Sequence, residues 1–245
     1  MLVGGSIAKA KAWAGLIPSP SVFIFIPGTG SWPTDLLDLT AKELKNGLLP
    51  RFHREHTWIC LDVTSVTGGW KAAAPNWVHQ FVADIVAQAQ SRDIDVSLVG
   101  FSRGAYWAAQ VVPTMPLNLK LKKVVLVAVY WMGEMDAQAA ALSLAAADGG
   151  VELISAVSMT DACCLWSVHG QAIMQLARPP HTLLLYSARS HEAMRESWIV
   201  GTAEDPNASQ IMVDFLYRDL QVRYTPPVGP RVHWYIDGAL VQPGP

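Results

Sequence analysis

A serine in a glycine-rich turn is the residue of this sequence best placed to do chemistry. Residues 100–104 read Gly-Phe-Ser-Arg-Gly and match the pattern G-x-S-x-G. An apolar run precedes them and apolar residues at helical spacing follow, which predicts a strand, a tight turn and a helix. Such a turn presents the hydroxyl of Ser102 at the end of the strand, next to the N–H groups that begin the helix. Ser102 is therefore the candidate nucleophile, and the alternative is a buried turn whose hydroxyl only caps the helix.

An earlier glycine turn is the candidate for binding an oxyanion. The apolar run 22–26 leads into Pro-Gly-Thr-Gly at residues 27–30. When a serine attacks a carbonyl, one stabilising N–H comes from the residue after the nucleophile, here Arg103, and a second comes from such an early loop. The candidate second donors are Gly28, Thr29 and Gly30, and the alternative is an ordinary turn. A dinucleotide site does not fit, because no third glycine completes G-x-G-x-x-G.

These two features, in this order, resemble the α/β-hydrolase superfamily. The resemblance extends over roughly residues 20–240 and comprises strand, oxyanion turn, strand, G-x-S-x-G turn and further strands ending near a histidine. The string Gly-Phe-Ser-Arg-Gly-Ala-Tyr, together with the early Pro-Gly-Thr-Gly, is also similar to secreted bacterial phospholipase effectors and their relatives. The resemblance implies a mostly parallel central sheet flanked by helices, and catalytic residues in the chain order Ser, acid, His.

This chain order places the base late in the sequence. His233 lies beyond the last predicted strand, where the resemblance implies the catalytic histidine. A neutral imidazole there accepts the proton of Ser102 and returns it to the leaving group. His191, which follows the predicted strand 182–186, is the alternative base, and the non-catalytic alternative for His233 is a packed surface residue.

The acid that orients the histidine departs from the pattern of the superfamily. Alignment after the predicted strand 182–186 places Ser190 where the superfamily often has an aspartate. Glu192 is the first candidate acid, because its longer side chain still reaches the Nδ1 side of His233. Asp136, which follows the preceding predicted strand, is the second candidate. The further candidate carboxylates are Glu134 and Asp205. If no acid is present, the enzyme is slower.

The elements that must position these residues are strands alternating with helices. Short continuous apolar runs are typical of strands buried on both faces, and several segments between them show helical periodicity. This alternation predicts a parallel sheet with helices on its faces. The predicted strands are 22–26, 58–63, 96–99, 124–131, 182–186 and 220–224, and the predicted helices are 35–48, 76–91, 209–220 and a segment after Arg103.

Length and continuity predict one domain, 1–245, rather than two. A chain of 245 residues is ordinary for a single α/β domain. No internal repeat, low-complexity tract or linker divides the sequence. The alanine-rich stretch 137–180 has no strand signal, and it is predicted to be a helical insertion or lid within the domain.

Composition excludes several classes of function. Hydrophobic residues make up 51% of the chain and charged residues 16%, with a net charge of −2, so charge-driven disorder is excluded and nucleic acid is not an expected partner. Prolines interrupt the uncharged segment 12–34, so no integral membrane span is expected. Three cysteines without CxxC spacing, and the lack of a signal-peptide pattern, predict a cytoplasmic protein. His53 and His56 lack a matching third ligand, so no metal is expected.

The sequence thus predicts a serine hydrolase that cleaves a carboxylic ester, with an acyl-enzyme formed on Ser102. Esterase, lipase, lysophospholipase and thioesterase activities all fit, and the apolar composition favours an apolar acyl group. No organic cofactor is expected, and the oligomeric state is not specified. One alternative is an acyltransferase that uses the same acyl-enzyme. The other is a non-catalytic ligand-binding protein with a hydrolase-like pocket, which Ser190 in place of an aspartate would favour.

Overall fold

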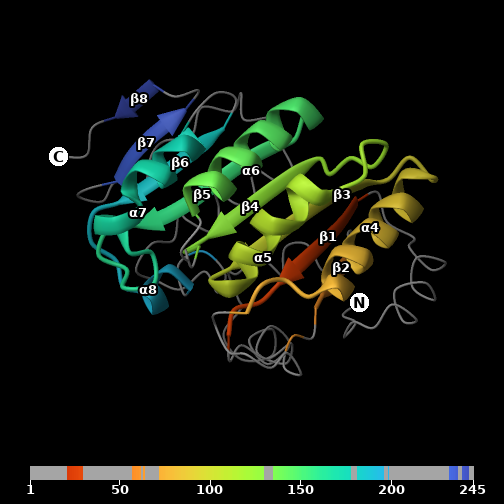
Figure 1. Ribbon diagram of the computed structural model, residues 1–245, viewed down its shortest axis with the longest axis horizontal. Coiled ribbons are helices and arrows are strands. Elements are labelled where there is room, and N and C mark those ends of the chain that lie inside the picture. The colour runs from red at the N-terminus through yellow and green to blue at the C-terminus, as the bar shows by residue number, and fades with distance from the viewer. Residues whose placement is uncertain are drawn as a thin grey trace.

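The fold is an eight-stranded sheet with helices packed against it (Figure 1). The computed structural model describes residues 21–29, 57–61, 63, 72–129, 135–177, 181–195, 198, 232–236 and 239–242. The strands are β1 (Ser21–Ile26), β2 (Thr57–Cys60), β3 (Asp95–Phe101), β4 (Lys123–Val127), β5 (Glu152–Ser158), β6 (Thr182–Tyr186), β7 (Val232–Ile236) and β8 (Ala239–Gln242). The helices are α4 (Asn76–Gln90), α5 (Arg103–Val111), α6 (Met135–Gly149), α7 (Trp166–Ile173) and α8 (His191–Arg195), with 3-10 turns η2 (Val112–Thr114) and η3 (Met174–Ala177). Among these described helices, none is both long and apolar enough to cross a membrane.

The order of strands across the sheet is β2-β1-β3-β4-β5-β6-β7-β8, and neighbouring strands from β2 to β6 are parallel. β7 and β8 run antiparallel and form one edge of the sheet, with β2 at the other edge (Figure 1). The carboxyl ends of parallel strands lie at the same edge of a sheet, which is where α/β proteins bind their ligands. The loops after β1, β3, β5 and β6 therefore meet at one edge, although they are far apart in sequence.

The core lies between the sheet and its helices. All five residues of β4 are buried, and the four that follow Lys123 form the continuous apolar run expected in the middle of a parallel sheet. Helix α4 has an apolar stripe at helical spacing, and Val78, Phe81, Val82 and Ile85 of this stripe are fully buried. This packing explains why α4 forms where the periodicity predicts a helix.

Helix α5 approaches the sheet so closely that two positions require glycine. A Cβ on Gly104 would collide with the backbone carbonyl of Ile26 at the end of β1. A Cβ on Gly100 would lie 2.6 Å from the Cα of Ala105, inside α5. The two glycines thus allow the first turn of α5 to contact β1, and they fix the position of the chain between β3 and α5.

Most predicted elements within the described residues are confirmed. The predicted strands 22–26 and 96–99 lie within β1 and β3, 58–63 and 124–131 overlap β2 and β4, and 182–186 is β6. The predicted helix 76–91 is α4, and the helix predicted after Arg103 is α5. The segments 35–48, 209–220 and 220–224 lie outside the described residues.

The prediction of a helical insertion at 137–180 is wrong. This stretch contains β5, which pairs with β4 on one side and β6 on the other, so it is part of the central sheet. Ser155 and Ser158 interrupt the apolar run of β5 and hide the strand signal, although both serines are fully buried. The helices α6 and α7 on either side of β5 are the crossover connections that parallel strands need.

The close approach at Gly104 can be tested with alanine. We expect Gly104→Ala to lower the free energy of unfolding by about 3 kcal/mol, because backbone must move to admit the methyl group. The matched control is Gly149→Ala at the end of α6, where the nearest atom to a new Cβ is the Cγ2 of Val151 at 3.4 Å. The control should raise the free energy of unfolding by up to about 1 kcal/mol. Denaturant unfolding compares the two, and equal effects would contradict the assigned contact.

Candidate active site

Ser102 stands in a strained turn between β3 and α5. Its backbone has φ 55° and ψ −122°, a conformation that side-chain-bearing residues adopt only when the surroundings enforce it. The Ser102 N–H donates to the carbonyl of Val127 at the end of β4 (2.9 Å), and its own carbonyl accepts from the N–H of Tyr106 (3.1 Å). These bonds and the two glycines hold Ser102 at the carboxyl edge of the sheet.

His191 contacts the Ser102 hydroxyl. Its Nε2 lies 2.8 Å from the Oγ of Ser102. His191 is the first residue of α8, and Ser190 before it accepts the N–H of Ala193 on its Oγ (3.1 Å) and the N–H of Met194 on its carbonyl (3.0 Å). The imidazole also packs against the ring of Phe101, with 5.1 Å between the ring centroids. The imidazole is therefore held from both its backbone and its ring face.

Asp161 completes the arrangement from the loop after β5. Its Oδ2 lies 2.7 Å from the Nδ1 of His191, and its Oδ1 accepts the N–H of Cys163 at 2.8 Å. The Asp161 side chain is completely buried. Because a carboxylate only accepts hydrogen bonds, Nδ1 carries the imidazole proton, and the lone pair of Nε2 faces the Ser102 hydroxyl. The chain order of the three residues is Ser, Asp, His.

A reciprocal pair of hydrogen bonds joins the loop of Asp161 to the loop of His191. The Ser158 hydroxyl donates to the carbonyl of Arg189 (2.7 Å) and accepts the N–H of the same residue (2.9 Å). Next to it, the N–H of Met159 donates to the carbonyl of Tyr186 (2.8 Å). Ser158 is thus the last residue of β5 and also the link that sets the spacing between the acid and the imidazole.

The structure corrects the predicted base. His191, the alternative, is the histidine that contacts Ser102. His233 lies within β7, where it pairs with Leu185 of β6 in the sheet register, and its side chain is outside the described residues. The prediction of His233 assumed that this residue follows the final strand, whereas β7 and β8 both come later than the run 220–224.

The structure also corrects the predicted acid. Glu192 forms an ion pair with Arg195 at 2.5 Å, and its side chain is 61% exposed. Asp136 lies in the first turn of α6, with its side chain outside the described residues, as are Glu134 and Asp205. Ser190, at the position aligned with an aspartate, caps α8. The acid in contact with His191 is Asp161, which was missed because the strand before it was missed.

The predicted oxyanion turn lies directly beside Ser102. Gly28 is buried after β1, and a Cβ there would lie 3.0 Å from the Cβ of Ser102 and 3.0 Å from the ring of Phe101. Thr29 follows it and is exposed, and Gly30 lies outside the described residues. Arg103 directly follows Ser102 and is the first residue of α5, so its backbone N–H lies at the amino end of this helix. Burial lowers the pKa of the Arg103 guanidinium, whose side chain stacks on Trp107.

Comparison with known proteins agrees with this architecture. No protein-family model and no curated protein matches the sequence. An uncharacterised protein from Bacillus cereus has a TM-score of 0.56 at 14% identity, over 83% of this chain and 60% of its own length. A "CIB-like hydrolase" from Thermoplasma acidophilum has a TM-score of 0.51 at 11% identity, over 81% and 87% of the two chains. E-2-(acetamidomethylene)succinate hydrolase has a TM-score of 0.51 at 11% identity, over 80% and 90%.

The chain has the α/β-hydrolase fold. The predicted fold class is therefore confirmed. In this α/β-hydrolase fold, the four loops at the carboxyl edge supply the glycine turn, Ser102, Asp161 and His191 in that order. The match covers 60% of the length of the Bacillus cereus protein.

The link through Ser158 can be tested against a second buried serine of the same strand. We expect Ser158→Ala to lower the free energy of unfolding by about 1–3 kcal/mol, because two backbone groups of Arg189 lose their bonds to the hydroxyl. The control is Ser155→Ala, since the Ser155 hydroxyl is fully buried and has no hydrogen-bond partner within the described part of the chain. Removal of that hydroxyl should leave the free energy of unfolding equal to that of the parent protein or raise it. Denaturant unfolding decides, and equal losses for both variants would contradict the role of Ser158.

Proposed function

We propose that this protein is a serine hydrolase that cleaves carboxylic esters through an acyl-enzyme on Ser102. The observation that carries the proposal is the hydrogen-bonded chain from Asp161 through His191 to Ser102, with contacts of 2.7 and 2.8 Å. A serine hydroxyl is a weak nucleophile until a base accepts its proton, and the base acts best when a buried acid holds its tautomer. The three residues meet both conditions, and we assign them as a catalytic triad.

In the first half-reaction, Ser102 attacks the ester carbonyl. The hydroxyl proton passes to Nε2 of His191 as the new C–O bond forms, and Asp161 offsets the charge of the imidazolium. The tetrahedral intermediate collapses when the leaving alkoxide takes the proton from Nε2, which leaves the acyl group on Ser102. In the second half-reaction, water gives a proton to Nε2 and attacks the acyl-enzyme, which releases the acid and restores Ser102.

Backbone N–H groups at the two ends of the site are assigned to the oxyanion. One belongs to Arg103 at the start of α5, and the other belongs to Gly28 or Thr29 in the turn after β1. A donor of this type contributes about 3–4 kcal/mol to stabilisation of the transition state. The close approach of Gly28 to Ser102 supports this assignment, because a larger residue would fill the space beside the nucleophile.

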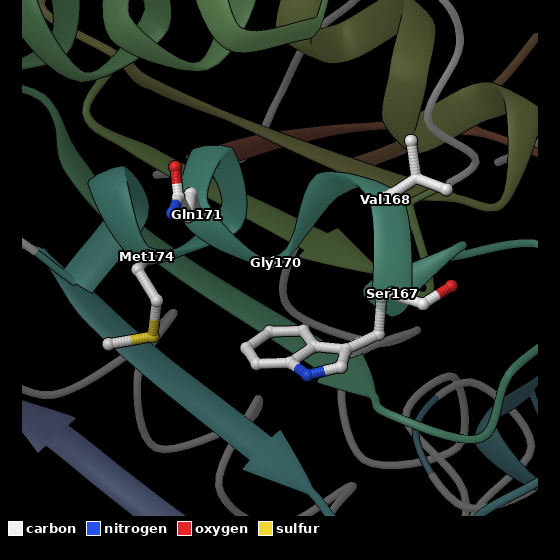
Figure 2. A pocket seen from close by; sticks show the side chains of 6 residues that line it. Ser167, Val168, Gly170, Gln171 and Met174 are labelled. Carbon is white, nitrogen blue, oxygen red and sulfur yellow. The ribbon is translucent and has the colours of Figure 1, made fainter.

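The surface around Asp161 favours an ester with an apolar acyl chain. Three of the five large hydrophobic residues exposed in the described part of the chain lie within residues 159–168, namely Met159, Leu165 and Val168. A cavity of about 620 Å³ lies along α7 and η3 (Figure 2), and it is lined by six uncharged residues, namely Trp166, Ser167, Val168, Gly170, Gln171 and Met174. None of the residues that line this cavity is charged, so together with the exposed hydrophobic residues it suits an uncharged acyl chain better than a charged substrate.

The position of Asp161 weakens one of the two alternative functions, the non-catalytic ligand-binding protein. The ligand-binding alternative depended on Ser190 in place of an aspartate, and the carboxylate of Asp161 now fills that need. The acyltransferase alternative shares the same acyl-enzyme and differs only in the molecule that captures it. No described residue favours an alcohol or amine acceptor over water, so hydrolysis is the proposed reaction.

Labelling with a fluorophosphonate probe tests the triad. We expect one adduct per chain, mapped by peptide mass to Ser102, and none on Ser102→Ala. His191→Asn and Asp161→Asn should each slow labelling and ester hydrolysis by about 10⁴-fold. The first variant lacks the base, and in the second no carboxylate keeps the proton of the His191 imidazole on Nδ1.

The matched controls for this experiment are His233 and Glu192, the base and the acid that the sequence analysis placed first. His233→Asn and Glu192→Gln should keep labelling rates within about threefold of the parent protein, since neither residue belongs to the proposed triad. An adduct that depends on His233 and not on His191 would overturn the assigned base. Folded parent protein that takes no probe would overturn the proposed function.

The preference for an apolar acyl chain has its own test. We expect Val168→Asp to lower the ratio of kcat/KM for p-nitrophenyl octanoate over p-nitrophenyl acetate by about tenfold, because each buried methylene contributes about 0.8 kcal/mol. The control is Leu117→Asp, a fully exposed leucine before β4, at the opposite edge of the sheet from Ser102. An unchanged ratio for Val168→Asp, or an equal change for both variants, would exclude this surface as the acyl site.

A further inference from the structure

A thiol lies beside the acid and base of the site, and the proposed reaction does not use it. Cys163 follows Asp161 by two residues, and its N–H bonds the Asp161 carboxylate, so the same turn carries the Cys163 side chain to this carboxylate. One ligand atom each from Asp161, Cys163 and His191 lies within 4.8 Å of the other two. Asp161 is buried, whereas Cys163 and His191 are partly exposed, so the cluster is open to solvent on one side.

The dimensions of this cluster suit a tetrahedral cation. Zinc binds sulfur at about 2.3 Å and imidazole nitrogen or carboxylate oxygen at about 2.0–2.2 Å, which places neighbouring ligand atoms about 3.3–3.7 Å apart. The observed separations include 2.7 Å between Nδ1 of His191 and Oδ2 of Asp161 and extend to at most 4.8 Å for the set. Shifts of roughly an ångström in side-chain position satisfy the tetrahedral distances.

The neighbouring Asp161 carboxylate affects the ionisation of the Cys163 thiol. Burial, and then the charge and hydrogen bond of Asp161, raise the pKa of the Cys163 thiol above its usual value. A thiol in this state is a poor nucleophile, so reactivity does not explain its place. A divalent cation between the two groups reverses the effect, because the positive charge stabilises the thiolate and the carboxylate together.

We propose that Asp161, Cys163 and His191 bind a thiophilic divalent cation of the Zn²⁺ or Cd²⁺ type, and that this cation inhibits the enzyme. A thiolate, an imidazole and a carboxylate select such ions over Mg²⁺ and Ca²⁺, which prefer all-oxygen sites. On binding, the thiol proton is released to solvent. The single proton of the neutral imidazole moves from Nδ1, which becomes the ligand, to Nε2.

Inhibition follows from this change of tautomer and rests on the proposed function. An Nε2 that carries a proton donates a hydrogen bond and cannot accept the proton of Ser102. The carboxylate of Asp161 is also shared with the cation and no longer orients the base. The cation therefore removes the activity without touching Ser102.

Binding is measured first, without reference to activity. Untagged protein is freed of metals with a chelator and titrated with Cd²⁺, whose thiolate complex has a sulfur-to-metal charge-transfer absorption. We expect one ion per chain, displaced by Zn²⁺, and an affinity that rises about tenfold per pH unit while the thiol is protonated. Cys163→Ser should weaken binding by about 100-fold, whereas Cys164→Ala, which removes the buried neighbouring thiol, should bind as the parent does.

The inhibitory effect is measured on the same proteins. Zn²⁺ should stop fluorophosphonate labelling of Ser102 over the concentration range in which it displaces Cd²⁺, and a chelator should restore labelling. Each variant is compared with its own metal-free rate, and Cys163→Ser should need about 100-fold more Zn²⁺. Absence of Cd²⁺ binding, or binding that is independent of Cys163, overturns the site. Zn²⁺ binding without loss of labelling would contradict the proposed inhibition. If the metal-free protein is not labelled, the proposed function is contradicted, and the Cd²⁺ titration still tests the metal site independently.

Discussion

The strained backbone of Ser102 is the constraint on which the rest of the site depends. A residue with a side chain at φ 55° is unstable by about 1–3 kcal/mol relative to ordinary conformations, so its neighbours must hold it there. The bond to Val127 anchors the N–H, and the absence of a Cβ at Gly100 and Gly104 lets α5 close against β1. This closure directs the hydroxyl away from the helix and out over the edge of the sheet, where another loop can reach it.

The parallel sheet converts sequence separation into proximity. Ser102 and His191 are 89 residues apart, and Asp161 and His191 are 30 residues apart, yet each pair is in hydrogen-bond contact. β5 and β6 are adjacent and parallel, so the loops after them leave the sheet side by side, and Ser158 joins these loops before either reaches its functional residue. The relative positions of Asp161 and His191 are therefore set by the sheet register and by the buried hydroxyl of Ser158. The two loops need little regular structure of their own.

The sequence was sufficient to predict the fold and the turn that carries Ser102, but it did not predict the contact between Asp161 and His191, and one strand explains the difference. Continuous apolar runs identify β1, β3, β4 and β6, because these strands are buried on both faces. In β5 the apolar residues are interrupted by Ser155 and Ser158, and burial of their hydroxyls depends on tertiary contacts that a single sequence does not display. When β5 is not predicted, β6 occupies the position of the strand that precedes the acid in the α/β-hydrolase pattern. The alignment then looked for the acid near Ser190 and for the base after a later strand, which led to His233.

In the proposed function, the geometry that lets His191 act as a base is also the geometry that would let it bind a metal. An imidazole held by a buried carboxylate has a fixed ring plane, and carboxylate–histidine pairs of this type also occur around zinc in metalloenzymes, where the carboxylate orients the ligand. Whether the His191 imidazole acts as a base or as a metal ligand depends on which third group it interacts with, in addition to Asp161. The Ser102 hydroxyl on Nε2 favours proton transfer, whereas the Cys163 thiol, which lies within 4.8 Å of ligand atoms of Asp161 and His191, favours coordination. In this proposal, the cysteine two residues after Asp161 makes both arrangements available to the same residues, and the free concentration of a thiophilic cation sets which of the two is populated.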